Sequence, residues 1–180
     1  MSRTPSPALD PAAIVVMGVA GAGKTTVGQA LATHCGYAFV DGDALHPAAN
    51  IAKMSAGQPL TDADRAPWLA KVADWMDARL AEGRSGVVTC SALKRKYRDE
   101  LTLGRPAVRL VLLDGSRELI EARVAKRTGH FWPPGLLETQ FADFEPPGPD
   151  EAILVIDVAP PVDIQVAEIV ERLALTPAAA

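Results

Sequence analysis

The chain has 180 residues, of which 48% are hydrophobic and 22% are charged, and its formal net charge at pH 7 is −4. This composition is ordinary for a globular protein, and the mild negative charge gives no reason to expect a nucleic acid or a membrane surface as a partner. No apolar run approaches the ~20 residues that span a bilayer, and residues 1–12 lack the apolar core of a secretory signal. Two cysteines are too few for a disulfide framework. We therefore expect a cytoplasmic protein.

Short β-rich runs alternate with helical stretches along the chain. Residues 1–12 are predicted to be a flexible tail, and residues 13–175 a single domain. Strands are predicted at 13–17, 38–40, 87–90, 108–113 and 153–156, and helices at 24–34, 62–82, 116–127 and 162–173. Strands separated by helices predict an α/β fold of three layers, in which a five-stranded parallel sheet is covered on both faces. Ligands of such folds bind beyond the carboxyl ends of the strands, so functional residues are expected near 18–25, 41–46, 90–98 and 114–117.

The segment Gly18–Thr25 matches the pattern GxxxxGK[ST] of a phosphate-binding loop. A glycine-rich turn can match by chance, but this one follows an apolar strand and opens a helix, as phosphate binding requires. Lys24 is expected to reach the β- and γ-phosphates, and the Thr25 hydroxyl is expected to bind Mg²⁺. The residues predicted to bind the nucleotide are Gly18, Val19, Ala20, Gly21, Ala22, Gly23, Lys24, Thr25 and Thr26.

Two carboxylates, Asp41 and Asp43, follow the second predicted strand. One of them, Asp41, is a candidate to assist the metal, and Asp43 to take the proton of an attacking hydroxyl. The alternative is a turn that simply closes the strand. His46 comes next, at the expected mouth of the cleft, although a lone histidine is more often structural. Arg65 opens the long helix, either as a clamp for a carboxylate or as a solvated surface charge.

A basic segment, Ser91–Arg98, directly follows the third predicted strand. Lys94 and Arg98 are four positions apart, so they share one helical face and are expected to converge on an anionic ligand. The alternative is a basic helix face turned to solvent.

A lid is predicted at about residues 128–150, because Gly129 and the pair Pro133–Pro134 bracket a loop in its first part. Arg123 and Arg127 precede the lid, four positions apart. They are expected to neutralise charge on the transferred group, as arginine fingers do. The alternative is an ordinary helix surface.

Taken together, these segments resemble the thermoresistant-type gluconokinases over nearly the whole chain from Ile14 to about Leu173. The segments that carry the resemblance are Gly18–Thr26, DGDALHP (41–47), NIAKMSAGQPLTDADRAPWL (50–69), CSALKRKYRD (90–99), LDGSRELIEARVAKRTGHF (113–131) and LLETQFADFEPPGPDE (136–151). The second to fourth of these distinguish the chain from shikimate and adenylate kinases, which share the phosphate loop.

The resemblance implies a nucleoside-monophosphate-kinase-like fold, Mg²⁺ dependence and a homodimer. The implied reaction is ATP-dependent phosphorylation of D-gluconate on its 6-hydroxyl, which gives 6-phospho-D-gluconate and ADP. Asp43 is then expected near the attacking hydroxyl, and a cation among Arg65, Lys94 and Arg98 near the substrate carboxylate. Catalysis is assigned to Lys24, Asp43, Arg123 and Arg127, and substrate binding also to His46.

Two departures from the family pattern are present. The loop reads GAGKTT where many relatives carry serine, but Thr25 keeps the hydroxyl that the metal needs. Trp132 stands where relatives often carry methionine, which affects the packing of the lid more than the chemistry. Two rival hypotheses are a kinase for shikimate or another sugar acid, and a non-catalytic nucleotide-binding module. The presence of Lys24, Thr25 and Asp43 argues against the second rival.

Overall fold

The computed structural model describes residues 11–126, 135–176 and 178. Within these residues, five strands form one parallel sheet in the order β2–β3–β1–β4–β5. The strands are β1 (Ala13–Met17), β2 (Ala38–Val40), β3 (Gly86–Thr89), β4 (Val108–Asp114) and β5 (Ile153–Asp157). The helices are α1 (Lys24–Cys35), α2 (Ala48–Ser55), α3 (Asp62–Ala81), α4 (Arg95–Thr102), α5 (Arg117–Ala125), α6 (Leu136–Asp143) and α7 (Val162–Arg172), with a 3-10 turn η1 (Gly42–Leu45).

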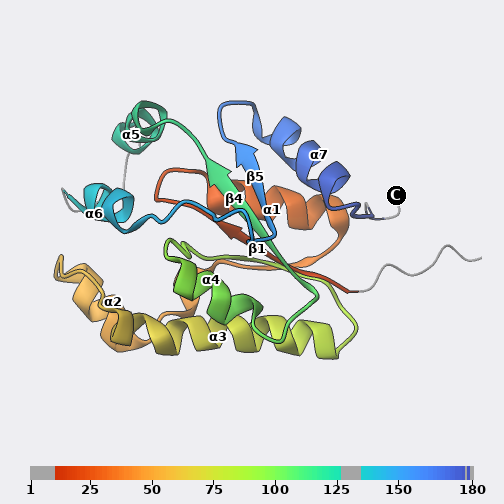
Figure 1. Cartoon of the computed structure of the whole chain (residues 1–180), viewed down its shortest axis with the longest axis horizontal. Coiled ribbons are helices and arrows are strands. Elements are labelled where there is room, and N and C mark those ends of the chain that lie inside the picture. The colour runs from red at the N-terminus through yellow and green to blue at the C-terminus, as the bar shows by residue number, and fades with distance from the viewer. Residues whose placement is uncertain (1–10, 127–134, 177, 179–180) are drawn as a thin grey trace, which may run out of the picture.

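The sheet is the middle one of three layers. Figure 1 shows α1 and α7 on one side of it, and α3 and α4 on the other. β1 is fully buried because its side chains alternate between two hydrophobic clusters. Ile14 and Val16 belong to the cluster that includes Leu31 of α1 and Ile169 of α7. Val15, whose side chain points to the opposite face of the sheet, packs in the other cluster with residues of α3 and α4. This apolar sandwich holds the carboxyl ends of the strands in fixed positions.

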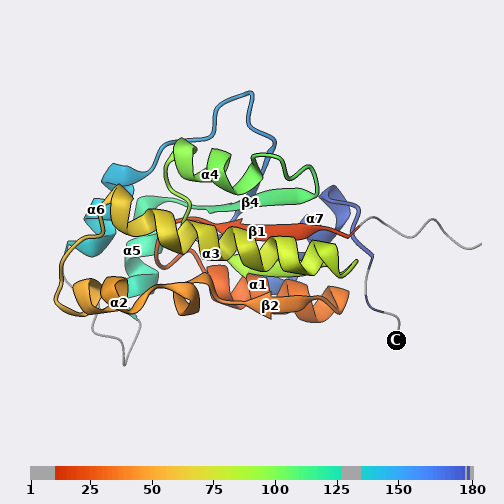
Figure 2. The same ribbon diagram turned by 90° about the horizontal axis from the view of Figure 1, so that it is seen from below.

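One end of the molecule collects the elements that matter for binding. β1 leads directly into the phosphate loop, and β2 leads into η1. In both ribbon views, α2, α5 and α6 lie beyond the ends toward which the strands point (Figures 1 and 2). A ligand held at this edge of the sheet is therefore surrounded by helices from three separate parts of the chain.

The expected strands and the three-layer α/β fold are confirmed, with strand limits that differ by at most one residue. The helix expected from 116 to about 127 is shorter, since α5 ends at Ala125. α2 and α6 were not predicted, and α4 was expected only as a basic helical face without bounds; each of the three has only eight residues, too few for a strong pattern. None of the helices in the described ranges combines the length and the hydropathy that a bilayer crossing requires.

Candidate active site

The phosphate loop curls tightly between β1 and α1. Gly18, Gly21 and Gly23 have φ values of 138°, 83° and 97°, a region that favours glycine. A Cβ on Gly21 would lie 2.5 Å from the Cγ2 atom of Val124, so the loop also needs glycine there to pack on α5. No described side chain caps the start of α1 at Gly23. The N–H groups of the first turn of α1 and the positive end of this helix are therefore available to an anion. In the loop itself, the Ala20 N–H donates to Gln140 and the Ala22 N–H to the Val19 carbonyl.

The loop forms one wall of a cavity of about 1040 Å³, which loop residues from Ala20 to Val27 line. Gly18 and Val19, at the beginning of the predicted nucleotide-binding set, lie outside that lining. The Lys24 ammonium donates to the carbonyl oxygen of Val19 at 3.1 Å, which folds the side chain back along the loop. This wall has the shape and the charge that a nucleotide's phosphates require.

Asp41 is held beside the loop by three hydrogen bonds. Its Oδ2 accepts from the Thr25 hydroxyl at 2.7 Å, and its Oδ1 accepts from the Thr89 hydroxyl at 2.9 Å and from the Asp43 backbone N–H at 3.0 Å. Burial alone would raise the pKa of Asp41, but these bonds and the charge of Lys24 outweigh it and lower the pKa. Asp41 is therefore a fixed, ionised carboxylate.

Thr25 and Asp41 together fit a magnesium ion. Mg²⁺ is usually bound by one or two carboxylates together with phosphate oxygens and waters, and not by a full protein cage. Accordingly, the described residues contain no cluster of three or more His, Cys, Asp or Glu suited to a metal, yet they offer two hard oxygen donors next to the phosphate loop.

Asp43, His46 and Arg65 form a second part of the cavity lining, the acceptor wall. His46 is only 7% exposed, and its ring stacks on Trp68 with a centroid separation of 4.3 Å. Trp68 is fixed in turn, because its Nε1 donates to the Gly42 carbonyl at 2.7 Å. Burial lowers the pKa of His46, the charge of Asp43 opposes this shift, and the charge of Arg65 reinforces it. The expected clustering of these three side chains is therefore present in the structure.

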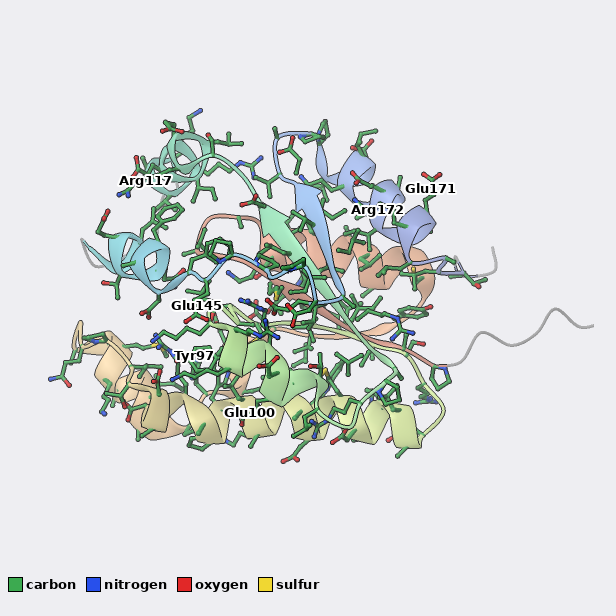
Figure 3. All side chains as sticks on the ribbon, viewed as in Figure 1. Tyr97, Glu100, Arg117, Glu145, Glu171 and Arg172 are labelled. Carbon is green, nitrogen blue, oxygen red and sulfur yellow. The ribbon has the colours of Figure 1, made fainter. Side chains whose placement is uncertain are left out.

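Arg65 reaches the cavity while held by two groups behind it. Its Nη1 donates to the Tyr97 hydroxyl at 3.1 Å and lies 3.5 Å from the Asp143 carboxylate. Tyr97 projects from α4, as Figure 3 shows. Both contacts involve Nη1, and a guanidinium has five N–H donors. Arg65 can therefore still bind a carboxylate in the cavity.

The prediction that Lys94 and Arg98 converge on one ligand is wrong. Lys94 pairs with the carboxylates of Asp62 and Asp143, at 3.5 and 3.3 Å, and it does not line the cavity. Arg98 is buried, with a side chain only 2% exposed, and its guanidinium donates to both carboxylate oxygens of Glu151, at 2.6 and 2.9 Å. It also donates to the carbonyls of Leu93 and Glu145. Glu145 and Glu151 lie some fifty positions further along the chain, so no local pattern revealed these two partners.

The predicted arginine pair and lid are only partly described. Arg123 lines the cavity, and its Nη2 donates to the Val158 carbonyl at 2.6 Å. Arg127 and the segment His130–Trp132 lie outside the described residues. The end of the predicted lid, residues 145–151, is bonded to α4 through Arg95 and Arg98.

Several residues at the cavity were not predicted. They are Val27, Met54, Ser55, Gly57, Gln58, Pro59, Leu60, Trp68, Thr89, Gly135, Thr139, Gln140, Ala159, Pro160, Pro161, Val162 and Gln165, and Ser91 lies in the expected region 90–98 without having been singled out. Those after β5 could have been found by applying the carboxyl-end rule to the fifth strand as well. By contrast, the expected region 114–117 does not line the cavity.

Known proteins match this chain over most of its length. A family model described as "AAA domain" matches residues 14–147. The gluconokinase of Gluconobacter oxydans is 48% identical over 91% of this chain and 92% of its own, and the thermoresistant gluconokinase of Escherichia coli is 42% identical over 87% and 90%. A solved gluconokinase from Sinorhizobium meliloti is 46% identical, covers 91% of this chain and 96% of its own, and has a TM-score of 0.77. The chain therefore belongs to the AAA-domain family of that model and, within it, to the gluconokinases, a family of P-loop kinases.

Proposed function

We propose that this chain transfers the γ-phosphoryl group of ATP to the 6-hydroxyl of D-gluconate. The hydroxyl oxygen forms a bond to the γ-phosphorus while the bond to the β,γ-bridging oxygen breaks, and the products are 6-phospho-D-gluconate and ADP. The hydroxyl proton passes to the Asp43 carboxylate or to solvent. The observation that carries this proposal is that the phosphate loop, Asp43 and Arg65 line the same cavity.

On the donor side, the loop N–H groups and the start of α1 bind the phosphates, and Lys24 neutralises charge on the transferred group. Thr25 and Asp41 would hold Mg²⁺, which when bound supplies charge neutralisation on the phosphate oxygens. Arg123 lines the same cavity and serves as a second cation for the nucleotide. Arg127 remains a proposed partner of Arg123, on the strength of its place four positions further along the chain and directly before the predicted lid.

On the acceptor side, Arg65 binds the gluconate carboxylate and Asp43 orients the attacking hydroxyl. His46 presents a neutral ring to the sugar hydroxyls, since burial disfavours its charged form. Lys94 and Arg98 have no place in this scheme, because neither lines the cavity and both are paired with carboxylates outside it. The acceptor is thus positioned by few, well-fixed side chains.

A coupled assay that follows ADP release across a panel of sugar acids and shikimate tests the substrate. We expect turnover of gluconate and at most weak turnover of shikimate, because relatives that cover most of the chain are gluconokinases. A boiled sample and the Lys24→Ala variant are the controls. Turnover of shikimate without turnover of gluconate would overturn the assignment.

The family resemblance also leads us to propose a cytoplasmic homodimer and a lid over about residues 128–150. Light scattering coupled to gel filtration measures the mass of the particle directly. A mass of twice 19.0 kDa is expected, and a mass of one chain at working concentration would contradict the dimer.

A further inference from the structure

Helix α6 touches three different sides of the active-site region. Glu138 pairs with Arg117, which Figure 3 shows on α5 beside α6. One turn further on, Asp143 pairs with Arg65 on the acceptor side. Between them, Gln140 reaches the phosphate loop and lines the cavity. This two-turn helix therefore connects the donor loop with the residue that we expect to bind the acceptor.

The contact of Gln140 with the loop fixes the orientation of its side-chain amide. Its Oε1 accepts from the backbone N–H of Ala20 at 2.6 Å. Because a backbone N–H can only donate, the atom that faces Ala20 must be the oxygen and not the nitrogen. The Nε2 group, with two N–H donors, therefore points away from Ala20, and within the described residues it has no hydrogen-bond partner.

The position of this amide matches the path of the transferred group. Gln140 lines the cavity and bonds to Ala20, in the loop that we expect to receive the phosphates, and it lies three positions before Asp143, which pairs with Arg65. The terminal phosphoryl group is the part of the nucleotide that crosses from one side to the other. A neutral amide donor adds a hydrogen bond to phosphoryl oxygens without adding a charge, and bonds to charged oxygens are stronger than neutral ones.

We propose that Gln140 recognises the terminal phosphoryl group of the nucleoside triphosphate: its Oε1 holds the Ala20 N–H, and its Nε2 donates to a γ-phosphate oxygen. This inference rests on the proposed kinase function and assigns a further donor to that site. It predicts that Gln140 distinguishes a triphosphate from a diphosphate and lowers the barrier to transfer.

The substitution Gln140→Glu separates this role from simple support of the loop. A glutamate side chain can still accept the Ala20 N–H, but it replaces the donor with a negative oxygen that repels the phosphate. Gln140→Leu removes both contacts. The matched control is Glu138→Gln, which also exchanges a carboxylate and an amide. Glu138 lies on the exposed side of the same helix and does not line the cavity.

The experiment compares kcat with ATP and gluconate, and also the affinities for ADP and for a non-hydrolysable ATP analogue measured by calorimetry. We expect both Gln140 variants to lose roughly 10- to 100-fold in kcat, while Glu138→Gln stays near the wild-type value. Gln140→Glu should weaken binding of the analogue by roughly tenfold and leave ADP affinity nearly unchanged. Thermal melting confirms that each variant is folded.

Two outcomes would overturn the inference. In one, Gln140→Glu keeps the wild-type kcat while Gln140→Leu loses it, which means that only the bond to Ala20 matters. In the other, ADP and the analogue lose affinity equally. The binding comparison does not depend on the acceptor. If the wild-type protein fails to phosphorylate gluconate, the proposed substrate is contradicted. If Gln140→Glu nevertheless weakens binding of the ATP analogue and not of ADP, the role of Gln140 is supported.

Discussion

The two walls of the cavity are built in opposite ways. The donor wall is one continuous segment, residues 20–27, whose backbone N–H groups and helix start we expect to bind the phosphates. The acceptor wall combines Asp43 and His46, at the η1 turn, with Arg65 of α3. His46 and Arg65 are held by residues distant in the sequence, since His46 stacks on Trp68 and Arg65 donates to Tyr97. A backbone site can therefore be recognised from a short pattern, whereas a side-chain site depends on which charges are paired elsewhere.

The largest effect is expected on the donor wall. Replacing Lys24 with alanine removes the positive charge that faces the transferred phosphoryl group, so kcat should fall roughly 1000-fold. The coupled assay at saturating ATP and gluconate measures this. Lys71→Ala, on the exposed side of α3, is the control and should retain activity. A Lys24→Ala variant with near wild-type kcat would show that the loop does not carry the chemistry.

The next largest effect is on stability. It concerns Arg98, which the sequence suggested as a residue that binds the ligand but which forms a buried ion pair. Replacing Arg98 with methionine leaves the Glu151 carboxylate buried without its partner, which should cost about 3–5 kcal/mol of unfolding free energy. Urea unfolding followed by tryptophan fluorescence measures this. The double variant Arg98→Met/Glu151→Leu should recover most of the loss, because it removes the unpaired charge. A single variant as stable as wild type would mean that the pair contributes nothing.

This contrast between Arg65 and Arg98 shows what the sequence could and could not predict. Strand positions followed from apolar runs, and the loop followed from its glycines, because both depend on neighbouring residues. The pairing of Arg98 with Glu151 and the bond from Gln140 to Ala20 depend on the tertiary fold, which brings together residues 53 and 120 positions apart. No local spacing carries that information, so the pattern predicts that Lys94 and Arg98 bind a ligand, although neither side chain lines the cavity.

A smaller effect is expected at Arg65. Replacing it with alanine should raise the KM for gluconate roughly 10- to 100-fold, with little change in the KM for ATP, because only the acceptor carboxylate loses its partner. Initial rates with each substrate varied in turn measure both constants. The control is Lys96→Ala, because Lys96 is an exposed cation of the basic segment Ser91–Arg98 and does not line the cavity. An equal rise in both KM values would indicate a general distortion of the cavity and not the loss of a carboxylate contact.

The smallest effect concerns the pH dependence of stability at His46. Burial lowers the pKa of this ring, Arg65 acts in the same direction, and Asp43 opposes them. The unfolded chain therefore takes up the proton first, so stability is complete above the ordinary histidine value of about 6.5 and decreases as the pH falls below it. His46→Asn removes this dependence, although it also loses contact with Trp68. The difference in unfolding free energy between wild type and variant should be largest at pH 8 and smaller at pH 5, as measured by urea unfolding at both values. A difference that is equal at the two pH values would mean that His46 is as easily protonated in the folded protein as in the unfolded chain. The acceptor wall would then contain a histidine that titrates normally, and not a ring held in its neutral form.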